Sequence, residues 1–95
     1  MGVNGLNGGY VSVADVLEVI AEFEALEPAG VSAGLVAWEL RQSESTVHAL
    51  IEAAQEEELI ALSGWDERRG EQLWKLTLAG RDHLESRTRS GSEHG

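Results

Sequence analysis

The sequence predicts an α-rich α+β domain made of a first helix, a helix-turn-helix, a β-hairpin and a closing helix. Residues 32–58 contain two apolar stripes at helical spacing, separated by a short polar turn. Residues 59–76 alternate apolar and polar side chains on either side of a loop with glycine at both ends, a pattern typical of a hairpin. At 95 residues the chain has the size of one domain with a single core.

The first helix is expected to begin after Ser12, because Asp15 follows three residues later in a capping-box-like arrangement. Pro28 excludes the residue before it from the helix. Apolar side chains at helical spacing form a broad stripe: Val13, Val16, Leu17, Val19, Ile20, Phe23 and Leu26. The opposite, solvated face carries Glu18, Glu22, Glu24 and Glu27. Such a broad stripe fits either a helix enclosed by its neighbours or a homodimer seam.

Two helices joined by a tight turn are expected next. Ser32 is a favourable N-cap for the first of them, after a short extended piece at residues 29–31. Gln42 and Ser43 form the turn, and Ser43 or Ser45 caps the second helix. The inward residues of the two helices are Val36, Ala37 and Leu40, then Val47, Leu50, Ile51 and Ala54.

The last third of the chain predicts two strands and a helix. The strands cover residues 59–63 and 71–76, and the loop GWDERRG at 64–70 joins them. By alternation, one face of this hairpin carries Ile60, Leu62, Trp74 and Leu76. Thr77 caps a final helix that ends near Ser86. We therefore expect a flexible N-terminal arm at 1–11, a folded domain at 12–86 and a flexible tail at 87–95.

Several of these residues resemble the winged helix-turn-helix transcriptional regulators of bacteria and archaea, the broad group that includes the MarR-like and PadR-like families. The resemblance covers about residues 13–86. It rests on the Ser-x-Ser-Thr-Val run at 43–47, on Leu59-Ile60, and on Leu76-Thr77 followed by Gly80-Arg81. It implies three helices, a two-stranded β-hairpin wing and a C-terminal helix, in a DNA-binding regulator that forms homodimers through its first or last helix.

The sequence departs from that group in the turn, at the end of the recognition helix and on its surface. Gln42 stands where the group usually has an apolar residue, and Glu58 stands where it usually has a glycine in the left-handed conformation. The outward positions of the recognition helix carry no Lys or Arg, although the group usually has several cationic or large polar residues there.

The net charge of −10 is distributed unevenly along the chain. Through residue 60 there are eleven acidic side chains and one basic side chain, Arg41, whereas the remaining residues hold six of each. A surface that neutralises phosphates needs an excess of Lys and Arg. Such a surface must therefore come from the last third, while the acidity elsewhere is consistent with a role in solubility.

For a complex with double-stranded DNA, the start of the recognition helix is expected to enter the major groove. The residues expected to contact DNA are Ser43, Ser45, Thr46, His48, Arg68, Arg69 and Arg81. Arg87 and Arg89 add cations if they lie on the same side. The wing supplies the arginine pair at 68–69, so most of the electrostatic attraction is expected there.

The same scaffold also fits a protein-interaction module that does not bind DNA. Trp65 lies in a predicted loop, and Trp is favoured at the centre of protein interfaces. Glu44 and Glu52 would form an acidic contact on the recognition helix. The simpler interpretation of Trp65 is that its ring folds back over the hairpin.

Other functional classes receive little support. The chain has no cysteine, no Gly-rich phosphate loop and no nucleophile with a matched base, and its three histidines are scattered, so we expect no enzyme and no cofactor. Glu44, His48 and Glu52 share one helix face at a spacing that suits metal ligands, but a solvated acidic face is the preferred interpretation and no metal is expected. Without a signal peptide or a membrane-length apolar run, we expect a cytoplasmic protein.

Overall fold

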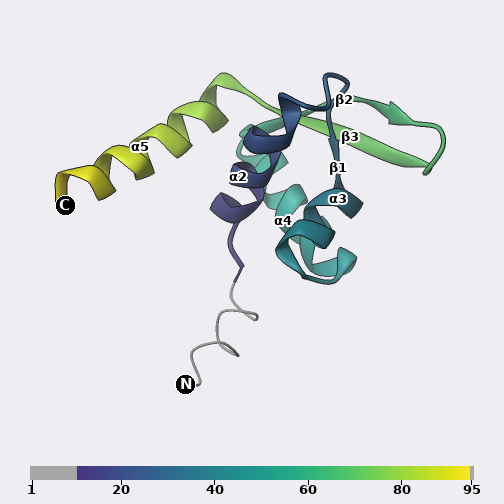
Figure 1. Ribbon diagram of the computed structural model, residues 1–95, viewed down its shortest axis with the longest axis horizontal. Helices are drawn as coiled ribbons and strands as arrows, with labels where there is room; N and C mark the ends of the chain where they lie inside the picture. Colours follow the sequence, from purple (N-terminus) through teal and green to yellow (C-terminus); the bar gives the residue numbers. More distant parts are fainter. Residues whose placement is uncertain (1–10, 95) are drawn as a thin grey trace.

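The computed structural model describes the backbone of residues 11–94 and the side chains of residues 11–87. In chain order the elements are α2 (Val13–Glu24), β1 (Val31–Ser32), α3 (Ala33–Leu40), α4 (Glu44–Glu56), β2 (Ile60–Asp66), β3 (Glu71–Leu76) and α5 (Leu78–His94). Figure 1 shows α2, α3 and α4 gathered together, with the β2–β3 hairpin and α5 extending away from them in opposite directions. This is the predicted winged helix-turn-helix layout. No helix in the described part is long and apolar enough to cross a membrane.

Helix α2 supplies the centre of the core. Val16, Leu17 and Ile20 are completely buried, which confirms most of the predicted stripe. Its start is also as predicted, because the Ser12 backbone N–H donates to Asp15 Oδ2 over 2.8 Å. Leu26 was wrongly placed in the stripe: α2 ends at Glu24, and Leu26 is 70% exposed.

Glu24 is a second correction to the expected surface of this helix. Its carboxylate was expected on the solvated face, but the side chain is only 10% exposed. It forms an ion pair with Arg81 of α5 and accepts a hydrogen bond from the Leu76 backbone N–H over 3.4 Å. Helical spacing alone could not predict this burial, because both partners lie more than fifty residues away in the sequence.

The sheet has three antiparallel strands in the order β1-β3-β2. The predicted hairpin is present, and the short extended piece before α3 adds β1 as a third strand, with Val31 opposite Trp74. On the other side of β3, Leu62 lies opposite Trp74 and Ile60 lies opposite Leu76. β3 is therefore the central strand and joins the wing to the helical core.

Strand β2 is longer than predicted and contains a bulge between Leu62 and Gly64. It continues to Asp66, so the turn is confined to residues 67–70 instead of 64–70. Leu62 was expected on the same face of the hairpin as Ile60, and it is 53% exposed, whereas Ile60 is buried. β2 is one of the two edge strands of the sheet, and among the described strands it pairs only with β3.

Helix α5 runs to His94, eight residues beyond the expected end near Ser86. Thr77 prepares its start: the Thr77 hydroxyl accepts from the Gly80 N–H over 3.0 Å and donates to the Glu58 carbonyl over 2.6 Å. Gly80 is required here, since a Cβ at that position would lie 2.1 Å from the Leu59 carbonyl oxygen. The flexibility expected for residues 1–11 concerns a segment almost entirely outside the described residues, and the flexibility of 87–95 stays a prediction.

The end of α4 has the left-handed residue that the sequence suggested. Glu58 has φ +62°, a conformation that favours glycine. A non-glycine residue in this region carries a strain of about 1 kcal/mol. The departure from the usual glycine therefore leaves the backbone geometry unchanged and lowers stability.

Replacing this residue tests that strain. Glu58→Gly should raise the free energy of unfolding by roughly 0.5–1 kcal/mol, because glycine adopts positive φ without a clash. Glu57→Gly is a matched control, since it removes the same charge at a residue with φ −88° and should lower stability. Urea unfolding followed by circular dichroism measures both, and equal shifts for the two variants would contradict the assignment of strain to Glu58.

Candidate nucleic-acid interface

Recognition helix α4 begins with a network of hydroxyl groups. The Ser43 Oγ accepts from the Thr46 backbone N–H over 3.2 Å, which makes Ser43 the N-cap and leaves Ser45 as the first-turn residue. Ser43 also donates to Thr46 Oγ1 over 2.9 Å and lies 3.3 Å from the Ser45 hydroxyl. Ser43 was predicted to contact DNA, but its hydroxyl hydrogen is already used inside this cap.

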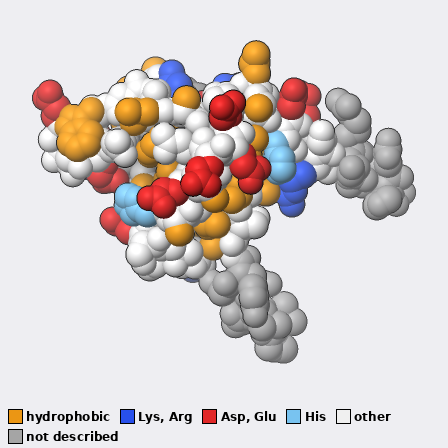
Figure 2. All heavy atoms as spheres, turned by 180° about the vertical axis from the view of Figure 1, so that it is seen from behind, with side chains coloured by type: hydrophobic (Ala, Val, Ile, Leu, Met, Phe, Trp, Pro, Cys, Tyr) orange, Lys and Arg blue, Asp and Glu red, His pale blue; other side chains and the backbone are white. Residues whose placement is uncertain are grey.

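The exposed face of α4 is acidic. Val47, Ile51 and Ala54 point into the core, as predicted. The exposed outward positions are Glu44, Ser45, His48, Ala49 and Glu52, whereas Thr46 is half-buried. Figure 2 shows acidic side chains gathered across this side of the molecule, with Lys and Arg side chains only at its margins. The predicted contact residues Ser45 and His48 are thus accessible, but glutamates surround them.

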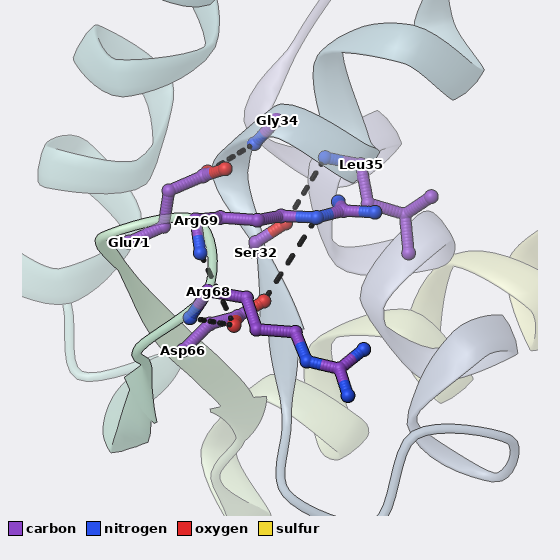
Figure 3. A network of polar contacts seen from close by, with 7 residues as sticks. All are labelled: Ser32, Gly34, Leu35, Asp66, Arg68, Arg69 and Glu71. Atoms are coloured by element: carbon purple, nitrogen blue, oxygen red, sulfur yellow. Dashed lines mark hydrogen bonds and ion pairs between the residues drawn. The ribbon is translucent and has the colours of Figure 1, made fainter.

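The wing tip is held by Asp66. One oxygen of its carboxylate accepts from the backbone N–H groups of Arg68 and Arg69 over 3.0 and 3.4 Å, and the other lies 3.9 Å from Arg69 Nε. Figure 3 shows the Arg69 side chain running back toward the start of α3, while the Arg68 guanidinium points away from this network. Among the described residues Arg68 has no carboxylate partner, so it is the more available of the two predicted wing cations.

The tip end of the wing is also tied to the start of α3. Glu71 Oε1 accepts from the Gly34 backbone N–H over 2.9 Å, next to the Ser32 hydroxyl, which accepts from the Leu35 N–H over 3.2 Å (Figure 3). Ser32 is therefore the N-cap that the sequence predicted. A Cβ at position 34 would lie 3.0 Å from the Glu71 carboxylate, so a side chain there would push this contact apart. These bonds fix the wing relative to the helix-turn-helix.

The C-terminal arginines contribute less than expected to this surface. Arg81 forms its ion pair with the nearly buried carboxylate of Glu24, and Arg87 Nη1 lies 3.2 Å from Glu18 Oε2. The Arg89 side chain lies outside the described residues. A phosphate contact by Arg81 would compete with a pair that stabilises the fold.

A cleft lies between the start of α4 and the wing. It encloses about 490 Å³. Its lining comprises Ala33, Glu44, His48, Trp65, Arg69, Gly70, Glu71, Gln72 and Trp74. Trp65 was one of the predicted protein-interaction residues, and its side chain is 58% exposed at this cleft. Glu44 and Arg69 both line this cleft. The sequence had assigned Glu44 to a protein interface and Arg69 to DNA binding.

Sequence reasoning missed Gln72 and Trp74 as parts of this surface. Trp74 was predicted only as part of one hairpin face, and it is 6% exposed while also lining the cleft. Alternation places Gln72 on the same face of β3 as Trp74. Alternation could therefore have placed both residues on one face of the hairpin, but no local pattern shows that the start of α4 lies across the cleft from that face.

Comparison with known proteins identifies the fold. Neither a protein-family model nor a curated protein sequence matches the chain. Among solved structures it is similar to a mutant of Staphylococcus aureus MepR, with a TM-score of 0.74, 18% identity and coverage of 90% of this chain and 61% of that chain.

Two further structures of MepR give the same result. A MepR mutant from a multidrug-resistant clinical isolate has a TM-score of 0.69 at 20% identity, covering 84% of this chain and 57% of that one. MepR described as a transcription regulator of the multidrug efflux pump MepA has a TM-score of 0.66 at 19% identity, covering 84% and 58%. The chain thus spans about three-fifths of the length of these proteins, and the likeness confirms the winged-helix fold.

The two serines at the start of α4 provide a test of the cap. Ser43→Ala should lower the free energy of unfolding by about 1 kcal/mol, because the Thr46 N–H loses its acceptor. Ser45→Ala is the matched control and should change stability by less than about 0.5 kcal/mol. Thermal unfolding measures both, and a larger loss for the Ser45 variant would show that the cap is assigned to the wrong residue.

Proposed function

We propose that this chain is a winged-helix DNA-binding domain of a transcription regulator. The observation that carries the proposal is a single concave surface formed by the start of α4 and the wing tip, on a fold shared with a transcription regulator. A helix and a wing arranged around one surface provide the two elements that read a duplex, the helix in the major groove and the wing beside it. Ser45, Thr46 and His48 are the candidates for contacts to the bases. Arg68 and Arg69 are the candidates for contacts to the phosphates of the DNA backbone.

The charges on this surface set the mode of binding. Glu44 and Glu52 repel phosphates on the exposed side of α4, and Arg69 already lies near Asp66. The wing therefore supplies most of the attraction. With about two phosphate contacts per protomer, the logarithm of the binding constant should fall with the logarithm of salt concentration with a slope of about −2. Such binding is weak for one protomer.

A homodimer would double that attraction, and we place its interface on α2 and α5. Leu78 at the start of α5 is 82% exposed, and Leu26 after α2 is 70% exposed. α5 extends away from the rest of the molecule (Figure 1), and most of its side chains between Leu78 and Arg87 are exposed. A cytoplasmic location accords with this function and remains part of the proposal.

The arginine pair of the wing is the direct test. The full chain should retard a pool of random duplexes at low salt, and Arg68→Gln with Arg69→Gln should weaken the binding constant by about tenfold, because two phosphate contacts are lost. The matched control is Arg41→Gln with Arg87→Gln, which removes the same charge away from the wing and should have a smaller effect. Fluorescence anisotropy with labelled duplexes measures both.

Two outcomes would overturn the DNA proposal. One is that no duplex is retarded even at low salt with divalent cations present. The other is that both arginine pairs weaken binding equally, since that result reports only the net charge and not the wing.

One observation favours a second candidate function, a protein-interaction module that does not bind DNA. The outward face of α4 has glutamates and no cation, and it adjoins the exposed ring of Trp65. Exposed aromatic rings next to charged groups are typical of protein interfaces. A partner held in this way would depend on Trp65 and Glu44 and not on the wing arginine pair.

A further inference from the structure

The cleft between α4 and the wing contains two groups that the fold does not use. The side chains of Glu44 and His48 form no hydrogen bond or ion pair within the described part of the chain. By contrast, Glu71 accepts from the Gly34 N–H, and Arg69 lies against Asp66. The carboxylate of Glu44 is thus free to bind a ligand that enters the cleft.

The face of the sheet from which Trp65 projects is set by the backbone. The bulge between Leu62 and Gly64 shifts the register, so that Trp65 lies opposite Gln72 and on the same face of the sheet as Trp74. Without the extra residue Trp65 would point to the opposite face. Ser63, the bulged residue, donates from its hydroxyl to the Ala29 carbonyl over 2.6 Å. The ring is therefore held at the cleft by a strand, which limits the entropy that it loses on binding.

We propose that this cleft binds an arginine side chain carried by a cationic segment of a partner protein. The proposal rests on the protein-interaction function above and specifies its partner. A guanidinium stacks on the face of an indole ring and binds a carboxylate through two parallel hydrogen bonds, and Trp65 and Glu44 offer these two groups in one cleft. A lysine ammonium matches this pair of groups less well, because it is not planar.

The surroundings of the cleft favour a segment with more than one cation. Glu44, His48, Glu52 and Glu56 follow one another along α4 at intervals of four residues. They therefore lie on one face of the helix. All are exposed, and the whole chain carries a net charge of −10. Charge complementarity therefore selects a basic peptide over a nucleic acid, whose phosphates Glu44 would repel. A metal ion is not favoured, because the described residues form no cluster of three or more ligands.

The test uses the full chain and a fluorescein-labelled peptide of alternating arginine and glycine. We expect saturable binding at low salt, weaker binding of the corresponding lysine peptide, and no binding of a citrulline peptide, which keeps the shape of arginine without its charge. Trp65→Ala and Glu44→Gln should each weaken the binding of the arginine peptide by about tenfold. Unfolding curves for each variant confirm that it is folded.

The chain offers matched controls for both substitutions. Trp38 is 75% exposed on α3 and does not line the cleft, so Trp38→Ala should leave peptide binding unchanged. Glu57→Gln removes a charge at the far end of α4 and should have at most a small effect. The proposal that the cleft binds arginine is wrong if Trp38→Ala weakens peptide binding as much as Trp65→Ala does. It is also wrong if the arginine and lysine peptides bind with equal affinity.

The two proposals fail separately. If the chain binds duplexes through Arg68 and Arg69 but not the arginine peptide, this inference is overturned and the DNA proposal stands. If the peptide binds as described and no duplex is retarded, the inference is supported and the DNA proposal is overturned.

Discussion

The position of Trp74 in the central strand is the constraint on which the rest of the structure depends. β3 pairs with β1 on one side and β2 on the other, and Trp74 lies opposite Val31 and Leu62 in the two pairings. Its side chain is 6% exposed, so the strand is anchored in the core at this residue. Because the wing is the continuation of the same strand, this anchor also decides where the wing lies relative to α4 and forms one wall of the cleft.

Several polar side chains that suit DNA contacts are used by the fold instead. Ser43 caps α4, Arg81 neutralises Glu24, and Asp66 orders the wing tip around Arg69. Burying a carboxylate such as that of Glu24 is costly unless a cation and hydrogen bonds compensate it, so Arg81 is not freely available to a ligand. Fewer of the residues predicted from the sequence to contact DNA are therefore available to a ligand in the structure.

The sequence predicted the elements that depend on local patterns and missed those that depend on pairing. Most of the inward stripes and the cap at Ser32 follow from spacing and backbone preference and are present, and the structure selects Ser43 of the two serines expected to cap α4. The αL conformation of Glu58 was implied by the resemblance to winged-helix regulators, and it is present as well. The bulge in β2 and the burial of Glu24 depend on which residues lie opposite them, often far away in the chain. The cleft needs both the bulge and the docking of α4, so only its individual residues could be named in advance.

The inward and outward residues of α4 are under separate constraints. Val47, Ile51 and Ala54 determine the helix and its packing, whereas the glutamates on the exposed face contribute nothing to that core. Those at the C-terminal end of α4 oppose the helix dipole, at a cost of some tenths of a kcal/mol each. Acidic residues that lower stability and serve no packing role are explained by an effect outside the fold, either solubility or attraction of a cationic partner. The proposed attraction of a cationic partner would also give a role to the tryptophan that the bulge directs to the cleft lined by Glu44.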